Sequence, residues 1–367
     1  MKAIAIDPGR KGFKVIDRPE PEIDSENQIK LKVLQVGICG TDREEISGGR
    51  ADAPAGETEL IIGHEMLGKV VDIGSNVKSA SIGDYGLFTV RRECGACIPC
   101  KLGRSDMCLS GLYTERGIKS SNGYQAQFAV DEEKYFIKVP DEIKREAVLT
   151  EPTTIAEKAI DEAVKIQSLR IPGFSEKEWF RKSPVLVAGI GSVGLLASFI
   201  LSLKGSKVYG LDIVDENTIR PAILKGLGGT YIDGRKVSAD NINDTFGEMD
   251  FIFEATGFAK LEFQLMDALG NNGIYVLTGI PEGERPVTVM GNEIMREMVL
   301  KNQVLLGSVN ASKEHFKAAV KDLTEAKKRW GGLLSKMITR KIPIENFADA
   351  FNDHSTDDIK VVIEWEK

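Results

Sequence analysis

The chain has 367 residues, of which 42% are hydrophobic and 28% are charged, so its composition is typical of a folded protein rather than a disordered one. The formal net charge of -7 argues against a general affinity for nucleic acid or for an anionic membrane surface, and we expect neither as a partner. The longest strongly apolar run, LLASFILSL, is far shorter than the roughly 20 residues that span a bilayer, and the first residues show no signal-peptide core. We therefore expect a cytoplasmic protein of two domains that binds a small molecule.

The first 150 residues or so predict a β-rich domain. Short apolar or alternating runs, bounded by glycine and turn residues, predict strands within 29–37, 69–74 and 125–130. After this region, TTIAEKAIDEAVKIQSL at 153–169 places its apolar residues on one helical face and has threonines available as N-caps, so it predicts a connecting helix.

Four of the five cysteines stand in one short segment of the first domain, with the spacing C-x2-C-x2-C-x7-C: Cys94, Cys97, Cys100 and Cys108. Disulfides are disfavoured in a reducing cytoplasm, and four thiolates on a short loop can surround one zinc ion. Because four protein ligands leave no position for water, such an ion would stabilise the loop rather than catalyse a reaction. An iron–sulfur cluster is the alternative, but nothing else in the chain is typical of an electron-transfer protein.

The second domain is predicted from an alternation of strands and helices that follows the polar stretch PGFSEKEWFRKS. The strands VLVAG, KVYGLD, FIFEATG and IYVLTG alternate with helical patterns up to about Gly307, which predicts a doubly wound parallel sheet. The remaining tail predicts a helix near 314–337 and a final strand, IKVVIEW, that returns to the first domain. The predicted limits are 1–180, 181–308 and 309–367.

A dinucleotide site is predicted where the second domain begins. The motif G-x-G-x-x-G follows an apolar strand and opens a helix, in an order typical of pyrophosphate binding, and Asp212 ends the next strand, about 20 residues after the motif, where a carboxylate can hold the ribose hydroxyls. Turn glycines with a surface aspartate are the alternative interpretation. The candidate cofactor residues are Gly189, Gly191, Ser192, Val193, Gly194 and Asp212.

Three segments of the first region carry further zinc-ligand chemistry: GICGTD at 37–42, GHE at 63–65 and TEP at 150–152. Their thiol, imidazole and carboxylate groups would form an open, catalytic zinc site if the fold brought them together. Spacing alone cannot show that it does, because a lone cysteine in an apolar strand is usually a small core residue and a His-Glu pair is usually a surface pair.

The order of GICGTD, GHEMLGKVVDIG, the four-cysteine segment and VAGIGSVG resembles the medium-chain, zinc-dependent alcohol dehydrogenase family over essentially the whole chain. Within it, LTEPTTIAEKAI and GSVNASKEHF resemble the archaeal-type glucose 1-dehydrogenases. The resemblance implies a Rossmann doubly wound parallel sheet plus a GroES-like β-rich catalytic domain, with a cleft between them where zinc meets nicotinamide.

The resemblance also implies roles for individual residues. The ligands of the catalytic zinc would be Cys39, His64 and Glu151; Glu65 would lie beside the ion and could enter its coordination; and Asp42 would orient the histidine.

The resemblance also implies which residues contact the substrate. Thr41 matches the hydroxyl residue that contacts the substrate oxygen, and Glu115, Glu151 and Asn310 match sugar-binding positions. A turn hydroxyl, a solvated charge and a capping residue are the alternative interpretations of Thr41, Glu115 and Asn310.

Three positions depart from the family pattern. Glu44 stands where many members have a histidine that ends a proton relay, so either Glu44 or bulk water takes the proton onward. Leu300 stands where some glucose enzymes have a sugar-binding histidine. The segment LDIVDEN lacks the basic residues that several of them have after the second strand of the parallel sheet.

The resulting expectation is zinc-dependent oxidation of an aldose, glucose at C1 to gluconolactone, with hydride transfer to a nicotinamide cofactor. We expect two zinc ions per chain, NAD preferred over NADP, and a homodimer or homotetramer that associates through the apolar strand VLLGSVN. The alternatives are another sugar, polyol or hydroxy acid as substrate, and a non-catalytic dinucleotide-binding protein on the same fold.

Overall fold

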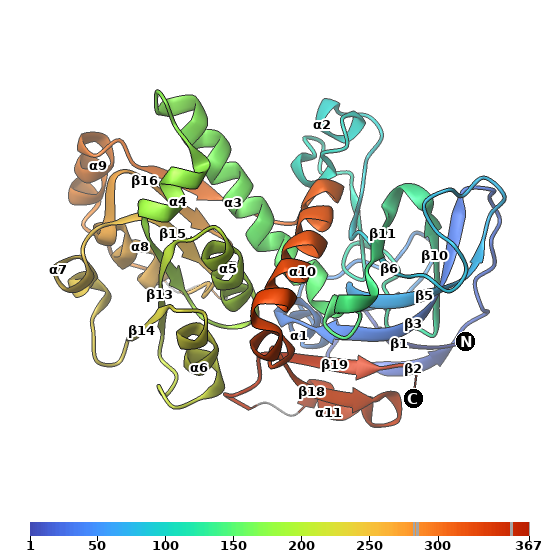
Figure 1. The fold of residues 1–367 in the computed structure, drawn as a ribbon. Helices are drawn as coiled ribbons and strands as arrows, with labels where there is room; N and C mark the ends of the chain where they lie inside the picture. The colour runs from blue at the N-terminus through green and yellow to red at the C-terminus, as the bar shows by residue number, and fades with distance from the viewer. Residues whose placement is uncertain (282, 284–285, 353–354, 367) are drawn as a thin grey trace. The chain divides into compact units, whose positions relative to one another are not determined.

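The computed structural model describes residues 1–281, 283, 286–352 and 355–366. They form two compact units, one made of Met1–Thr154 with Asn310–Lys367 and the other of Ile155–Val309. Both ends of the chain therefore belong to the first unit (Figure 1).

The first unit is built on a seven-stranded sheet whose centre is β3 (Gln28–Ile38). Along β3 the side chains alternate between buried and half-buried, as expected of a strand with one face toward the core. The sheet order is β11-β6-β5-β3-β19-β18, with β10 also on β3; the bounds are β5 (Glu65–Ile73), β6 (Tyr85–Phe88), β10 (Phe128–Glu132), β11 (Phe136–Val139), β18 (Ile338–Pro343) and β19 (Lys360–Glu364).

Two small sheets complete the β-structure of this unit. One has the order β2-β1-β4, with β1 (Lys2–Ile6), β2 (Lys14–Asp17) and β4 (Leu60–Ile61). The other has the order β7-β8-β9, with β7 (Arg91–Arg92), β8 (Thr114–Arg116) and β9 (Ser120–Ser121).

The final strand returns to the first unit, as the tail pattern predicts. Figure 1 shows β19 beside β3, and the register pairs Val361 with Ile38. On the other side of β3, β5 pairs Glu65 with Gly37. Residues from both ends of the chain are thereby brought to one place in the sheet.

The helices of the first unit are α1 (Gly40–Ile46), α2 (Ile98–Lys101), α10 (Lys313–Ser335) and α11 (Phe347–Asn352). The predicted tail helix corresponds to α10, whose regular geometry is interrupted at Trp330. Ser312 forms a capping box with His315 at its start.

The connecting helix, α3 (Thr150–Arg170), starts three residues before the predicted position. The expectation that its threonines act as N-caps is wrong, because Thr153 and Thr154 lie inside the first turns and their hydroxyls donate to the carbonyls of Leu149 and Glu151. The polar stretch that follows contains a further helix, α4 (Glu176–Lys182), which Ser175 caps and which buries Phe180.

The second unit has a six-stranded sheet of order β14-β13-β12-β15-β16-β17, in which every neighbouring pair is parallel. Its strands are β12 (Pro184–Ala188), β13 (Lys207–Asp212), β14 (Thr230–Asp233), β15 (Met249–Glu254), β16 (Leu269–Leu277) and β17 (Val304–Gly307). Since the chain reverses its direction of winding beside β12, the fold is the predicted doubly wound sheet.

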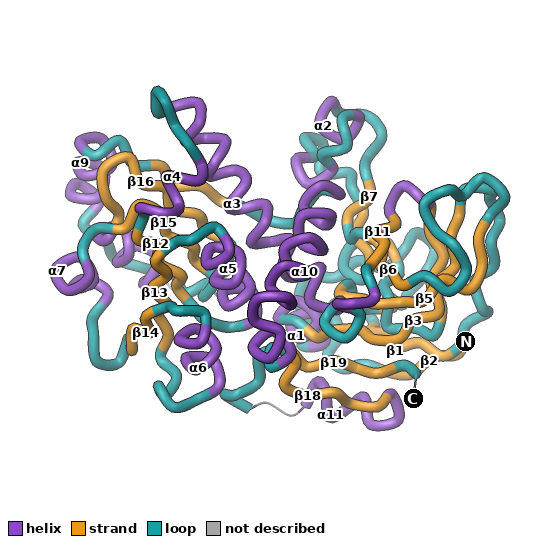
Figure 2. Tube along the Cα trace, in the orientation of Figure 1, coloured by secondary structure: helices purple, strands orange, loops and turns teal. Residues whose placement is uncertain are grey.

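Helices flank this sheet on both sides (Figure 2). They are α5 (Ser192–Leu203), α6 (Ile219–Gly226), α7 (Ile242–Phe246), α8 (Ala259–Gln264) and α9 (Gly291–Leu300). Figure 1 shows α5 and α6 on one side of the strands and α7 and α8 on the other. Leu186, Tyr209, Ile252 and Tyr275 form part of one buried cluster beneath them.

No helix in the described part of the chain is long and apolar enough to cross a membrane.

Candidate metal and dinucleotide sites

The first candidate metal site gathers a thiol, an imidazole and a carboxylate. Ligand atoms of Cys39, His64 and Glu65 all lie within 4.8 Å of one another, and the Cys39 Sγ lies 3.2 Å from the His64 Nε2. Cys39 caps α1 at the end of β3, whereas His64 and Glu65 stand at the start of β5. The pairing of β3 with β5 therefore brings GICGTD and GHE together, which their spacing could not show.

Glycines make room for this group. A Cβ atom added at Gly37 would lie 2.1 Å from the Glu65 Oε2, so a side chain there would displace the carboxylate. Gly63 has φ of +86°, and a Cβ atom there would lie 2.6 Å from the Gln125 Cγ. Gly37 in GICGTD and Gly63 in GHE are therefore required, because any side chain at either position would collide with a neighbouring side chain.

Charged groups surround the site. Asp42 accepts a hydrogen bond from the Cys39 backbone N–H at 2.8 Å, and its other oxygen lies 4.0 Å from the His64 Nδ1. Burial raises the pKa of the Cys39 thiol to about 11, and the Asp42 charge adds to the effect. Burial also raises the pKa of Glu151 to about 7, with the Glu65 carboxylate acting in the same direction.

The donor set fits zinc. Sulfur, imidazole nitrogen and carboxylate oxygen are the ligand atoms that zinc prefers. The His64 Nδ1 and the Asp42 Oδ1, both buried without a hydrogen-bond partner in the described residues, face each other at 4.0 Å, while the Nε2 faces the Cys39 sulfur, so the imidazole presents its Nε2 as the ligand atom. Glu151 does not belong to the group within 4.8 Å, so its ligand role stays a prediction and Glu65 is the carboxylate that the structure brings nearest.

Thr41 and Glu44 both lie on α1, directly after Cys39. The Glu44 carboxylate pairs with Arg50 at 3.0 Å, and this hydrogen bond lowers the pKa of Glu44. The pairing therefore keeps Glu44 ionised at neutral pH and makes it a weaker base than a free glutamate.

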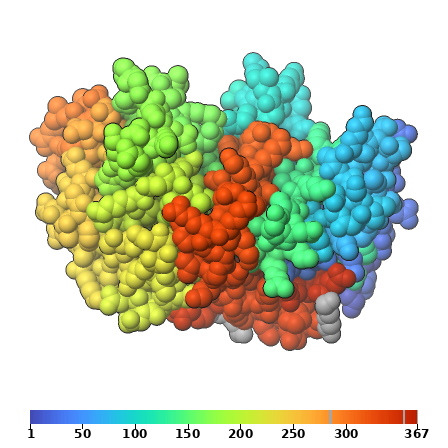
Figure 3. Space-filling view, in the orientation of Figure 1, coloured from blue at the N-terminus to red at the C-terminus, as the bar shows by residue number. Residues whose placement is uncertain are grey.

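The second candidate metal site is the four-cysteine group. The sulfur atoms of Cys94, Cys97, Cys100 and Cys108 lie within 4.8 Å of one another. They come from the segment around α2 and the short turn that follows it. This segment projects from the surface and is coloured cyan in Figure 3. Four converging sulfurs fit a closed zinc site.

The glycine motif of the second unit forms the tight turn that the sequence predicts. Gly189 has φ of +84°, and a Cβ atom at Gly194 would lie 1.8 Å from the Gly189 carbonyl oxygen, so helix and strand pack closely only with glycine there. Ser192 and Val193 begin α5, and the Ser192 hydroxyl is buried without a hydrogen-bond partner in the described residues.

Asp212 stands at the carboxyl end of β13, beside that turn. Its Oδ2 accepts a hydrogen bond from the Ile190 N–H at 3.0 Å, and the Arg220 guanidinium lies 4.0 Å away. The carboxylate thus lies at the glycine turn, where the motif requires an acceptor for ribose hydroxyls.

Glu115 and Asn310, the candidate sugar-binding residues, contact each other. The Asn310 Nδ2 donates to the Glu115 Oε1 at 2.6 Å, and Arg91 donates to the same oxygen at 2.9 and 3.0 Å. Asn310 is in the left-handed region with φ of +59°, which asparagine tolerates better than most residues. The interpretation of Glu115 as a solvated surface charge does not hold, because only 9% of the residue is exposed.

Sequence reasoning missed three residues of these sites. Lys360 lies 2.6 Å from both carboxylate oxygens of Glu65. Arg91 holds Glu115, and Glu45 is fully buried one turn after Asp42. The available signal was a charged residue within an otherwise apolar stretch, which Lys360 in IKVVIEW provides.

Two family models match the chain. "Alcohol dehydrogenase GroES-like domain" matches residues 25–141 and "Glucose dehydrogenase C-terminus" matches residues 144–365. Among curated proteins, the glucose 1-dehydrogenase of Methanocella arvoryzae is 36% identical over 368 residues, covering 99% of each chain. That of Haloferax mediterranei is 37% identical over 370 residues, covering 100% of this chain and 99% of the relative.

Solved structures agree with this assignment. The glucose dehydrogenase of Haloferax mediterranei in complex with NADP, Zn and gluconolactone matches with a TM-score of 0.89 and 36% identity, over 100% of both chains. The galactitol-1-phosphate dehydrogenase of Escherichia coli matches with a TM-score of 0.80 at 22% identity, which shows the fold alone. The chain belongs to the glucose dehydrogenase family of the zinc-dependent, medium-chain alcohol dehydrogenases.

Proposed function

We propose that this protein oxidises glucose at C1 to gluconolactone and transfers the hydride to NAD(P). The observation that carries the proposal is the group of half-buried Cys39 with buried His64 and Glu65, in a chain that is 36% identical over 368 residues to a glucose 1-dehydrogenase. A non-catalytic binding protein has no need of an open set of three metal ligands.

Cys39, His64 and either Glu65 or Glu151 would hold the catalytic zinc ion. When bound, zinc supplies a Lewis acid that lowers the pKa of a hydroxyl group. Asp42 holds the start of α1 through the Cys39 N–H and faces the imidazole, so it orients two of the ligands. The cysteine cluster at 94–108 would hold a second, structural ion.

Glu115 and Asn310 would bind hydroxyl groups of the sugar. The Glu115 carboxylate has a second oxygen that can accept from a hydroxyl while its Oε1 is held by Arg91 and Asn310. A hydrogen-bonded, largely buried carboxylate has a defined direction and can distinguish a polyhydroxylated substrate from a simple alcohol.

Thr41 would pass the proton of the substrate hydroxyl, and Glu44 would receive it or pass it to water. Pairing with Arg50 lowers the pKa of Glu44, so Glu44 is a weak proton acceptor that would pass the proton on to water rather than keep it. The dinucleotide, when bound, accepts the hydride, and the protein's part is to orient it.

NAD is the proposed preferred cofactor. Asp212 can accept both ribose hydroxyls, whereas a 2′-phosphate at that position would meet a like charge. Arg220 at 4.0 Å and Arg235, which pairs with Asp233, are the basic groups that would allow NADP to bind as well.

The assembly is proposed to be a homodimer or homotetramer formed through β17, the edge strand of the parallel sheet. Leu305 on this strand is 40% exposed, and Val299, Leu300 and Val309 beside it in sequence are also exposed. An apolar edge of this kind is usually covered by another chain. We also propose that the enzyme is cytoplasmic and that 1–180, 181–308 and 309–367 are its functional domains.

A matrix of substrates and cofactors tests the proposal. Glucose, other aldoses, polyols and hydroxy acids are each assayed with NAD and NADP, together with the zinc content of the protein. We expect the highest kcat/KM with an aldose and two zinc ions per chain. A polyol or hydroxy acid as best substrate would replace the proposal with its alternative, and one zinc ion without turnover would support the non-catalytic binder.

A further inference from the structure

A buried carboxylate that no catalytic step uses lies at the end of β15. Glu254 is 0% exposed, and its backbone pairs with Ala188 of β12 and Leu277 of β16. It is therefore at the carboxyl edge of the three central strands, the edge at which doubly wound sheets bind dinucleotides. Burying a charge in a sheet is unfavourable unless hydrogen bonds stabilise it, so its partners indicate what it does.

In the described residues, the hydrogen bonds that the Glu254 carboxylate accepts come from the two loops that leave this edge. Its Oε1 accepts from the backbone N–H of Thr256 at 2.5 Å, from the Thr256 hydroxyl at 2.5 Å and from the Gly257 N–H at 2.9 Å. Its Oε2 accepts from the Gly279 N–H at 3.2 Å. One side chain thus ties the loop after β15 to the loop after β16.

The tied loops pack backbone against backbone. A Cβ atom at Gly279 would lie 2.1 Å from the Gly257 nitrogen, and one at Gly257 would lie 2.7 Å from the Ile280 carbonyl oxygen. The Thr256 Cγ2 would lie 2.8 Å from a Cβ atom at Gly189, the first glycine of the dinucleotide motif. Because Thr256 lies against Gly189, a shift of Thr256 would also shift the glycine turn of the dinucleotide motif.

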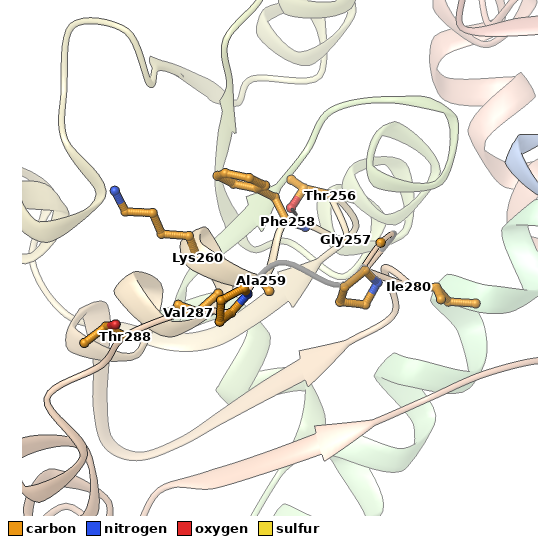
Figure 4. A pocket seen from close by; sticks show the side chains of 11 residues that line it. Thr256, Gly257, Phe258, Ala259, Lys260, Ile280, Val287 and Thr288 are labelled. Carbon is orange, nitrogen blue, oxygen red and sulfur yellow. Dashed lines mark hydrogen bonds between the residues drawn. The ribbon is translucent and has the colours of Figure 1, made fainter.

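The same loops form walls of a cavity of about 1040 Å³. Figure 4 shows Thr256, Gly257 and Phe258 on one side of it and Val287 and Thr288 on another, with Ile280 beyond. The Phe258 N–H donates to the Thr256 hydroxyl at 3.0 Å, and that hydroxyl donates to Glu254. The wall formed by Thr256, Gly257 and Phe258 is thus connected to Glu254.

We propose that Glu254 is a positioning residue for the nicotinamide dinucleotide: its carboxylate fixes the loops after β15 and β16 against each other and against the glycine turn. This inference rests on the proposed function for the identity of the ligand. The hydrogen bonds that the carboxylate accepts in the described residues come from these loops, so its effect on the cofactor passes through them.

Glu254→Gln is the informative variant, because it keeps the shape and size of the side chain while it replaces the carboxylate by a neutral amide. A glutamine amide has one oxygen, and in either orientation its NH₂ group faces a backbone N–H of one of the two loops. One loop therefore loses its acceptor while the side chain keeps its size. Asp250→Asn is the matched control, since it removes a carboxylate from the other end of the same strand.

The measurement is the Kd of NADH, followed by fluorescence with the full-length protein, together with the melting temperature. For Glu254→Gln we expect a Kd about tenfold higher, the loss that one hydrogen bond to a charged group produces. The KM for NAD should rise by a similar factor, with kcat at saturating NAD and the KM for sugar nearly unchanged. Asp250→Asn should bind NADH as the wild type does.

A second variant covers the case in which Glu254→Gln does not fold. Thr256→Val removes only the hydroxyl that connects Glu254 to Phe258, and we expect a smaller rise in Kd in the same direction. A lower melting temperature with an unchanged Kd in these variants would overturn the proposal, as would equal weakening by Asp250→Asn. If the wild type binds NADH but oxidises no sugar, the proposed function fails while the comparison of Kd values still decides the role of Glu254.

Discussion

The ammonium group of Lys360 lies 2.6 Å from a carboxylate oxygen of Glu65, and each side chain is only 2% exposed. The two residues come from β19 and β5, on opposite sides of β3, and Lys360 also approaches the Ile38 carbonyl at 3.3 Å. A buried carboxylate with no cation near it would be strongly destabilising. Lys360 therefore places a counter-charge beside the candidate ligand Glu65 at the metal site.

Replacing Lys360 by methionine should lower the free energy of unfolding by about 3–5 kcal/mol, because the Glu65 carboxylate then stays buried without its partner. The double variant Lys360→Met with Glu65→Gln should recover part of the loss, since a neutral amide needs no cation. Urea denaturation measures both.

Lys341→Met is the control for this experiment. Lys341 pairs with Glu364 at 3.4 Å but its side chain is 41% exposed, so its removal should cost no more than about 1 kcal/mol. Equal losses in the two single variants would contradict a special role for the buried pair.

The four-cysteine group is tested by Cys97→Ser. We expect the zinc content to fall from two ions per chain to one and the melting temperature to fall, because a structural zinc site contributes directly to folding. Protein that remains folded should keep appreciable turnover. An unchanged melting temperature combined with lost activity would assign catalysis to this cluster instead.

The cofactor preference is tested by Asp212→Ser. The ratio of kcat/KM with NAD to that with NADP should fall about tenfold or more, since the variant removes the like charge from the position of the 2′-phosphate. Asp215→Asn is the control: its side chain is 57% exposed, so solvent and salt screen it and the ratio should change little. Wild-type enzyme that works better with NADP at matched salt would refute the interpretation of Asp212.

Glu45 should make the stability of the protein depend on pH. The residue is fully buried, and in the described residues neither of its carboxylate oxygens has a hydrogen-bond partner. Burial, with the Asp42 charge, raises its pKa from 4.5 to about 9. Below pH 4.5, Glu45 is protonated in both the folded and the unfolded protein, and its contribution to stability is fully present. As pH rises from 4.5 toward 9, the unfolded protein releases this proton while the folded protein keeps it, so the contribution is lost.

Glu45→Gln should remove this loss, so the variant should gain stability over the wild type as pH rises from 5 to 8, by at most about 1.4 kcal/mol per pH unit. Glu44→Gln is the neighbouring control with the opposite sign, because Arg50 lowers the pKa of Glu44 and its contribution is lost only in acid. Thermal unfolding at several pH values distinguishes them. Parallel curves for the wild type and Glu45→Gln would mean that Glu45 does not titrate as stated.

Local patterns were sufficient for most of the fold. The parallel sheet follows from strand–helix alternation, and its glycine turn follows from steric needs that Gly189 and Gly194 show directly. The helix α4 was missed because its residues are mostly charged and its stability depends on burying Phe180 in the tertiary structure.

The candidate site was predictable only as separate segments. Cys39 and His64 meet because β3 and β5 pair, and spacing in the sequence contains no information on that pairing. Lys360 and Glu65 are separated by 295 residues, so their contact depends on the return of the last strand to the first sheet. Arg91 contacts Glu115 because β7 pairs with β8, and this pairing also cannot be read from spacing in the sequence.

Zinc-dependent oxidation of glucose at C1 can be followed by nuclear magnetic resonance of glucose labelled with ¹³C at C1. With NAD and the wild-type enzyme, the C1 signal should move to the carbonyl region of gluconolactone and gluconate, while His64→Ala, which should stay folded and bind NADH, should leave it in place. No carbonyl signal from the zinc-loaded wild type, or an equal signal from His64→Ala, would contradict zinc-dependent oxidation at C1.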